Sequence, residues 1–143
     1  MKTRALALMM LVGVAAIACT PNQEDEALND ARQVCIDLGF DNEDSEDSSD
    51  DDEQMTSGEL TEYSDNLDEE VDQAARAARL DQRWDRLSNA VTDSQEWFRQ
   101  LSISEDGLRS VDERNIAQER AAKLDSDEIV NVIRQECRKA LAP

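Results

Sequence analysis

The feature that most restricts the fold is a long segment suited to helix. Between residues 59 and 101 the sequence has neither glycine nor proline, the two residues least tolerated inside a helix. Apolar residues recur there at steps of three and four, which places them on one helical face. This stripe runs through Leu60, Leu67, Val71, Ala74 and Ala78, then Leu80, Trp84, Leu87, Val91, Ser94, Phe98 and Leu101. The segment predicts one long amphipathic helix or two successive ones.

Local signals mark its start and a break. Thr56 and Glu59 have the spacing of a capping box, in which each side chain accepts a hydrogen bond from the other residue's backbone N–H. The stripe shifts register at residues 78–80, and Asp81 is a good residue to begin a new helix. An unbroken helix would be about 60 Å long, too long for a small domain to cover. We therefore expect a break near residues 79–81, with a kinked single helix as the alternative.

Shorter helices are expected on both sides. Upstream, an apolar face predicts a helix over residues 27–40, with Gly39 ending it in the left-handed conformation. Downstream, Ser102 and Glu105 suggest another capping box, followed by a weaker helix. The last helix is predicted to begin at Asp125, with Glu128 completing its box. The apolar positions are Leu28, Ala31, Cys35 and Leu38 in the first, Leu108, Val111, Ile116 and Leu124 in the weaker one, and Ile129, Ile133, Cys137 and Leu141 in the last.

These patterns predict an all-α protein, a small helical bundle of about four helices formed by residues 56–143 together with the short helix 27–40. Residues 41–55 separate them, and most of residues 41–53 are Asp or Glu. Such a segment cannot bury enough apolar surface to offset the entropy of ordering, so we expect an acidic disordered linker. The alternative interpretation is a low-affinity calcium-binding segment, although it lacks the glycine of an EF-hand loop.

The N-terminus has the pattern of an export signal. Lys2 and Arg4 precede an apolar run over residues 5–18, too short to span a bilayer. The following Ala16-Ile17-Ala18-Cys19 resembles the lipobox of bacterial lipoproteins, with alanine where that family usually has leucine. The resemblance implies removal of residues 1–18, diacylglycerol on Cys19, and an extracytoplasmic location on a bacterial membrane. The alternative is an ordinary cleaved signal peptide with Cys19 unmodified. Residues 19–26 contain Pro21 and three carboxylates with nothing to bury, which predicts a tether.

The remaining cysteines form an even pair. Cys35 and Cys137 each lie at an apolar position of a predicted helix, and an exported protein enters an oxidising compartment. We therefore predict a Cys35–Cys137 disulfide between the first and last helices. Two buried free thiols are the alternative.

Composition argues against several classes of function. A net charge of −19 opposes binding to nucleic acid, which depends on Lys and Arg neutralising phosphates. The sequence has no histidine, so it lacks the commonest general base and the usual zinc ligand. Its four glycines form no phosphate-binding motif. We accordingly predict no enzyme, no cofactor, no metal site and no nucleic-acid partner.

The aromatic residues bear on binding. Trp84 and Phe98 lie on the apolar stripe and are expected in the core, whereas Trp97 lies beside it and is the candidate for a partner contact. The leading hypothesis is a membrane-anchored envelope lipoprotein that acts as an interaction or structural module for an envelope protein. The alternative is a lipoprotein that binds Ca²⁺ or a small ligand.

Overall fold

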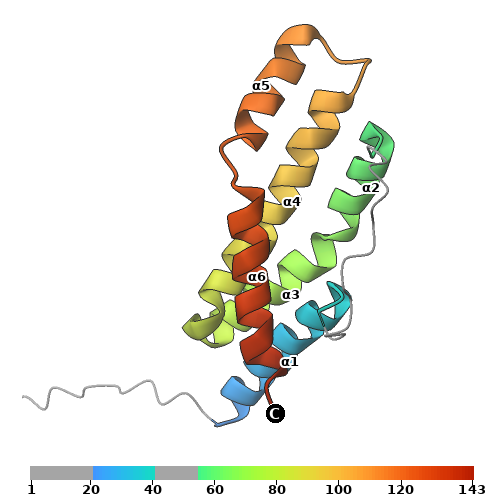
Figure 1. The fold of residues 1–143 in the computed structure, drawn as a ribbon. Coiled ribbons are helices and arrows are strands. Elements are labelled where there is room, and N and C mark those ends of the chain that lie inside the picture. Colours follow the sequence, from blue (N-terminus) through green and yellow to red (C-terminus); the bar gives the residue numbers. More distant parts are fainter. Residues whose placement is uncertain (1–20, 41–54) are drawn as a thin grey trace, which may run out of the picture.

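A computed structural model describes residues 21–40 and 55–143, whose regular structure is entirely helical (Figure 1). The all-α helical-bundle prediction is confirmed. The predicted signal peptide, Cys19 and residues 41–54 of the predicted linker lie outside these ranges. In chain order the elements are α1 (Pro21–Asp37), α2 (Ser57–Asn66), α3 (Asp68–Leu80), the 3₁₀ turn η1 (Gln82–Trp84), α4 (Asp85–Glu105), α5 (Val111–Ala121) and α6 (Ser126–Leu141).

Helix α4 is the axis of the molecule, and its two halves have different neighbours. Its first half packs with α3 and α6, and α1 in turn packs on α3 and α6 (Figure 1). Its second half lies between α2 and α5. We call α1, α3, η1, residues 85–93 and α6 the disulfide end, and α2, residues 94–105 and α5 the outer arm.

The main apolar core belongs to the disulfide end. Alanines on the facing sides of α1 and α3 allow these two helices to approach closely, and an Arg76–Asp30 ion pair of 2.8 Å joins them at the surface. The buried cluster contains Ala27, Ala31, Val34, Cys35, Ala74, Ala77, Trp84, Leu87, Ala90, Val91, Ile129, Ile133, Cys137 and Ala140. Trp84 is therefore a core residue, as predicted.

The outer arm buries more polar side chains. Ser64, Gln95, Gln100 and Ser102 are all buried there. The Gln95 amide nitrogen donates to the Ser64 carbonyl oxygen at 3.1 Å and to the Asp68 carboxylate at 2.6 Å. These bonds satisfy buried groups that would otherwise cost about 1–3 kcal/mol each.

Three predicted helix ends are present. Thr56 and Glu59 form both bonds of the capping box that begins α2. Asp125 caps α6 by accepting from the Glu128 N–H at 3.0 Å. The return bond of the predicted box, from the Asp125 N–H to the Glu128 carboxylate, is not formed in the described structure, so only half of that box is present. After α1, Gly39 has φ +80°, and the Phe40 N–H donates to the Cys35 carbonyl at 2.9 Å, which is a Schellman ending.

The long helical segment breaks twice. The predicted break occurs at Asp81, which is extended and accepts a hydrogen bond from the Arg83 N–H at 3.0 Å. A second break at Leu67, between α2 and α3, was not predicted. There the Gln95 side chain occupies the Ser64 carbonyl, and such an insertion into the helical hydrogen-bond ladder bends a helix. A contact with a residue far along the sequence causes this bend, so local patterns do not reveal it.

Two predicted boundaries differ from the structure. Helix α1 begins at Pro21, so residues 21–26, predicted as tether, are helical. Proline suits a first helical turn and Glu24 adds favourable charge there. The predicted Ser102–Glu105 box is wrong, because α4 continues to Glu105 and the Ser102 hydroxyl donates to the Arg99 carbonyl.

The start of α5 and its apolar face also differ from prediction. The box that starts α5 is formed by Ser110 and Glu113. Its buried residues are Ala117 and Ala121, whereas the predicted stripe is wrong because Leu108, Val111 and Ile116 are exposed. The small alanines let α5 approach α4 closely, which leaves the larger apolar side chains outside the contact.

Candidate functional site

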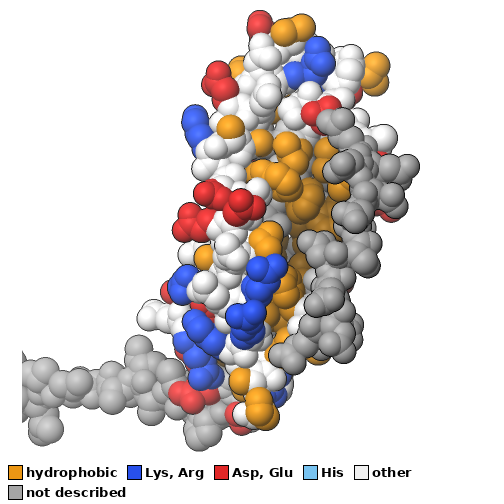
Figure 2. Space-filling model, viewed as in Figure 1, with side chains coloured by type: hydrophobic (Ala, Val, Ile, Leu, Met, Phe, Trp, Pro, Cys, Tyr) orange, Lys and Arg blue, Asp and Glu red, His pale blue; other side chains and the backbone are white. Residues whose placement is uncertain are grey.

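The candidate binding surface is the part of the α4 stripe that crosses the outer arm. Leu87 and Val91 are fully buried, but Ser94, Phe98 and Leu101 on the same stripe are only half-buried. Figure 2 shows hydrophobic side chains gathered over this part of α4, between α5 and α2. With Tyr63 and Trp97, these residues form what we call the outer apolar face: Tyr63, Ser94, Trp97, Phe98 and Leu101.

Three aromatic rings form the centre of this face. Tyr63 of α2 lies 4.4 Å from Phe98 of α4 between ring centroids, and Phe98 lies 4.9 Å from Trp97 in an edge-to-face arrangement. Tyr63 is 44% exposed. Phe98, predicted in the core, and Trp97, predicted at its edge, are both half-buried. Packed rings of this kind give a rigid contact surface at low entropic cost.

The helices of the outer arm bear more carboxylates than cations, the cations being Arg99 of α4 and Arg114 and Arg120 of α5. Helix α2 carries Glu59, Glu62 and Asp65 and has no Lys or Arg. Helix α5 begins with Asp112 and Glu113. Leu108 is 97% exposed in the turn before α5. The outer arm therefore combines exposed apolar side chains with carboxylates.

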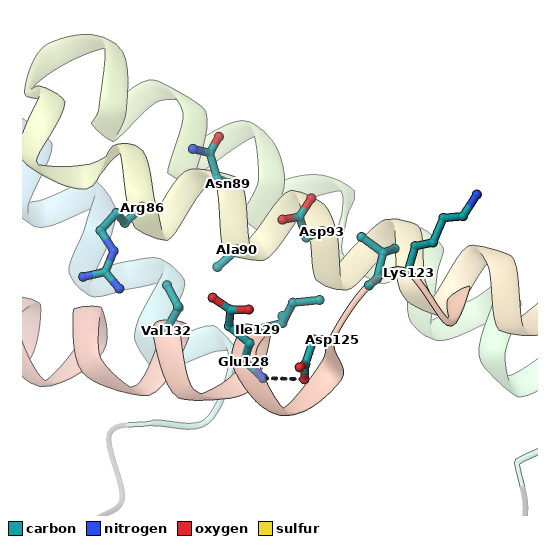
Figure 3. Close-up of a pocket in the computed structure, with 10 residues that line it drawn as sticks. Arg86, Asn89, Ala90, Asp93, Lys123, Asp125, Glu128, Ile129 and Val132 are labelled. Atoms are coloured by element: carbon teal, nitrogen blue, oxygen red, sulfur yellow. Dashed lines mark hydrogen bonds between the residues drawn. The ribbon is translucent and has the colours of Figure 1, made fainter. Parts of the chain in front are cut away.

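A cleft of about 370 Å³ lies between α4 and the start of α6. Its floor is apolar, and its rim carries both signs of charge, with Arg86 near one end and Lys123 near the other (Figure 3). The Asp125 carboxylate in the cleft is already engaged as the α6 cap. Because opposite charges alternate on the rim, the cleft favours no class of charged ligand. It is lined by Arg86, Asn89, Ala90, Asp93, Lys123, Leu124, Asp125, Glu128, Ile129 and Val132.

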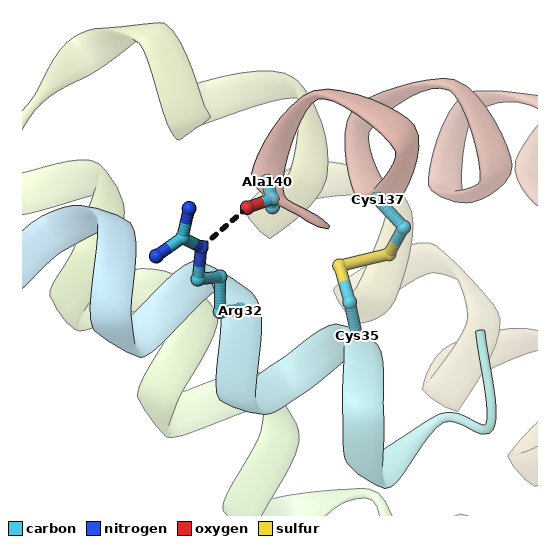
Figure 4. Close-up of a disulfide and its surroundings, with 4 residues drawn as sticks. All are labelled: Arg32, Cys35, Cys137 and Ala140. Carbon is cyan, nitrogen blue, oxygen red and sulfur yellow. Dashed lines mark hydrogen bonds between the residues drawn. A yellow bond between two sulfur atoms is a disulfide. The ribbon is translucent and has the colours of Figure 1, made fainter. Parts of the chain in front are cut away.

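At the disulfide end the two predicted cysteines meet. Cys35 of α1 and Cys137 of α6 form a disulfide with Cα atoms 5.4 Å apart, and both are buried (Figure 4). Arg32, one turn earlier in α1, donates through Nε to the Ala140 carbonyl at 2.6 Å and through Nη2 to the Ala142 carbonyl at 3.1 Å. The guanidinium thus caps the negative end of the α6 dipole beside the disulfide.

Sequence reasoning did not identify Glu136, the buried acid of α6. Its carboxylate is 1% exposed and lies 2.8 Å from the Lys139 ammonium and 3.3 Å from the Arg86 guanidinium. The spacing of three between Glu136 and Lys139 suggests an ordinary surface pair. Burial follows from the packing of α6 against α4, which only the fold reveals.

Within residues 21–40 and 55–143 no group of three or more acidic, cysteine or histidine side chains is placed to hold a metal ion. No helix in the same ranges is both long and apolar enough to cross a membrane. Comparison with models of known families, with characterised proteins and with solved structures finds no match to the chain.

Proposed function

We propose that this chain is a non-catalytic protein of a bacterial envelope, anchored by lipid at Cys19, that docks a protein partner on the outer apolar face. The docking proposal rests on a change in side-chain burial along the apolar stripe of α4. Leu87 and Val91 are fully buried, whereas Phe98 and Leu101 are not. Half-buried aromatic residues surrounded by polar ones are typical of interaction surfaces. The absence of histidine from the sequence favours a non-catalytic role.

The charges around the face define the partner chemistry. Tyr63 lies on α2, which bears three carboxylates and no Lys or Arg. The nearby cations are paired: Arg99 of α4 with Glu96, and Arg109 with Asp106 and Glu113. Electrostatic complementarity favours a partner that presents Lys or Arg beside its apolar side chains. We therefore propose an amphipathic, basic segment of an envelope protein as the occupant.

The anchor is tested by Cys19→Ser. Loss of the thiol should abolish incorporation of labelled palmitate in cells and leave the precursor uncleaved, because the thiol is the acceptor of the lipid. The Cys137→Ser variant, which keeps Cys19, should retain the label. Labelling that persists in Cys19→Ser would contradict lipidation at this residue.

Docking is tested by photo-crosslinking in whole cells from a benzophenone amino acid at Tyr63. A matched control places it at Ile36 of α1, which is 42% exposed against 44% for Tyr63. We expect one protein to be captured from position 63 and not from position 36, through a peptide rich in Lys or Arg and apolar residues. Trp97→Ala should weaken that capture. Equal capture from both positions, or capture through an acidic peptide, would contradict the proposal.

A further inference from the structure

A second cleft, of about 510 Å³, lies at the disulfide end between α1, η1 and α6. Three cations line it, one from each element: Arg32 of α1, Arg83 of η1 and Lys139 of α6. Leu28 and Trp84 contribute apolar surface to its wall. Figure 2 shows Lys and Arg gathered over the C-terminal half of α6, in a protein whose net charge is −19. Such convergence is unusual on so acidic a chain and indicates an anion site.

Each cation has an internal partner, and each retains donors. Arg32 is held by the carbonyls at the end of α6 through Nε and Nη2, and its Nη1 makes no bond to residues 21–40 or 55–143. The Arg83 Nε lies 2.7 Å from the Asp81 carboxylate, and its terminal nitrogens make no bond among the described residues. A guanidinium has five N–H donors, so both arginines can still bind an oxyanion.

Among the described residues that line the cleft, the only acidic side chain is Glu136, and it is already compensated. Glu136 is buried and contacts both Lys139 and Arg86, so its charge opposes an incoming anion weakly. The same pair engages Lys139 through both Glu136 oxygens, so the two arginines are the main anion donors of the cleft. Arg83 lies over the Trp84 ring, 5.5 Å from its centroid. The Trp84 indole N–H is buried and has no hydrogen-bond partner within the described part of the chain. Because that N–H is enclosed, we use it only as a spectroscopic probe of the cleft. The proposed anion site rests on the cations.

We propose that this cleft binds a phosphate group, supplied by an anionic phospholipid headgroup. The choice of lipid over free phosphate rests on the anchor proposed above. Residues 19 and 20 reach at most about 7 Å when extended, and Leu28 lies about 10 Å along α1 from Pro21. A lipid on Cys19 would therefore place the cleft within reach of the headgroups. Binding there would fix the orientation of the domain on the membrane.

The test uses the mature chain from residue 19 carrying Cys19→Ser, so that no lipid is attached. The Trp84 indole N–H resonance is followed by NMR during titration with inorganic phosphate at constant ionic strength, and Trp97→Phe assigns it. Flotation is then compared for phosphatidylcholine vesicles with and without phosphatidylglycerol. We expect a saturable shift of the Trp84 resonance, and flotation only with phosphatidylglycerol.

Arg83→Gln should lower the apparent affinity for inorganic phosphate and for phosphatidylglycerol vesicles about tenfold, which is the effect of losing one charge-assisted hydrogen bond. Arg83→Lys, which keeps the charge, should retain most of the binding. The matched control is Arg134→Gln, which removes the same charge from α6 but does not line the cleft. Thermal midpoints verify that each variant is folded.

Each outcome decides a different point. No shift of the Trp84 resonance and no flotation would overturn the site. Equal losses in Arg83→Gln and Arg134→Gln would overturn it in favour of diffuse attraction. A shift with inorganic phosphate but no flotation would support a phosphate site and overturn the lipid source. Palmitate labelling of Cys19 is measured separately, so failure of the anchor and failure of this site remain distinguishable.

Discussion

The disulfide end and the outer arm share helix α4, but they bury its apolar stripe to different extents. At the disulfide end α3 and α6 enclose Leu87 and Val91 completely, and a disulfide ties α1 to α6. In the outer arm α2 and α5 pack on either side of α4 through Leu60 and through buried glutamines, serines and alanines, leaving Phe98 and Leu101 half-buried. The disulfide end therefore supplies most of the stability, whereas the outer arm has apolar surface available to a partner.

Loss of the disulfide should lower the stability of the fold more than any other change, and the destabilisation should be concentrated in the disulfide end. A cross-link between residues 102 apart stabilises by about 4–5 kcal/mol in the chain-entropy model. Cys35→Ser with Cys137→Ser should lower the thermal midpoint by more than about 10 °C. Hydrogen exchange should show the greatest loss of protection in α1. Intact-mass analysis after alkylation without reductant checks the premise, since uptake of two alkyl groups would mean free thiols.

A matched pair of substitutions on α4 compares the two halves directly. Leu87→Ala, in the disulfide end, should cost about 2–5 kcal/mol because it opens a cavity in a closed core. Leu101→Ala, in the outer arm, should cost about 1 kcal/mol, since water already reaches part of the side chain. Urea denaturation of both variants gives the comparison. Equal costs would show that the outer arm is packed as tightly as the disulfide end.

Glycine substitutions sharpen the comparison at the chain reversals. Gly39, with φ +80°, ends α1, and an alanine there should cost about 1–2 kcal/mol because L residues are strained in this conformation. Gly107, before α5, has neither a positive φ nor an atom within 4 Å of an added Cβ. Gly107→Ala should therefore leave the midpoint of urea denaturation within error of the parent protein. A comparable loss in both variants would contradict this assignment.

The sequence predicted most of the disulfide end and little of the outer arm, for a physical reason. Local patterns predict where four of its residues lie. A helical stripe places Cys35, Cys137 and Trp84 in the core, and Gly39 is the residue suited to a left-handed turn. The bend at Leu67 depends on the Gln95 side chain, and the burial of Glu136 depends on α4 contacting α6. These features arise from contacts between distant segments, which a periodic pattern does not encode. The outer apolar face was anticipated only through Trp97, because Ser94, Phe98 and Leu101 follow a stripe that is typical of a core and Tyr63 lies outside every predicted apolar stripe.

The capping boxes make the outer arm the more acid-sensitive region. Hydrogen bonds from the Thr56 backbone N–H and hydroxyl lower the pKa of Glu59 below its usual 4.5, and the Ser110 hydroxyl and backbone N–H lower the pKa of Glu113 likewise. A carboxyl whose folded pKa lies below its unfolded pKa stabilises the fold above the unfolded value. This contribution is lost as the pH falls through the folded pKa. Acidification below about pH 4.5 should therefore loosen the first turns of α2 and α5.

The effect is small, and it must be measured locally. Acidification also relieves repulsion among the carboxylates of a chain with net charge −19, which raises global stability and hides the loss in a thermal midpoint. Backbone chemical shifts at residues 57–60 and 111–114 report each turn directly. Glu59→Gln keeps a hydrogen-bond acceptor but does not titrate, so it should flatten the pH dependence of α2 while leaving that of α5 unchanged. If the first turn of α2 still loosens with acid in this variant, then Glu59 is not the group responsible.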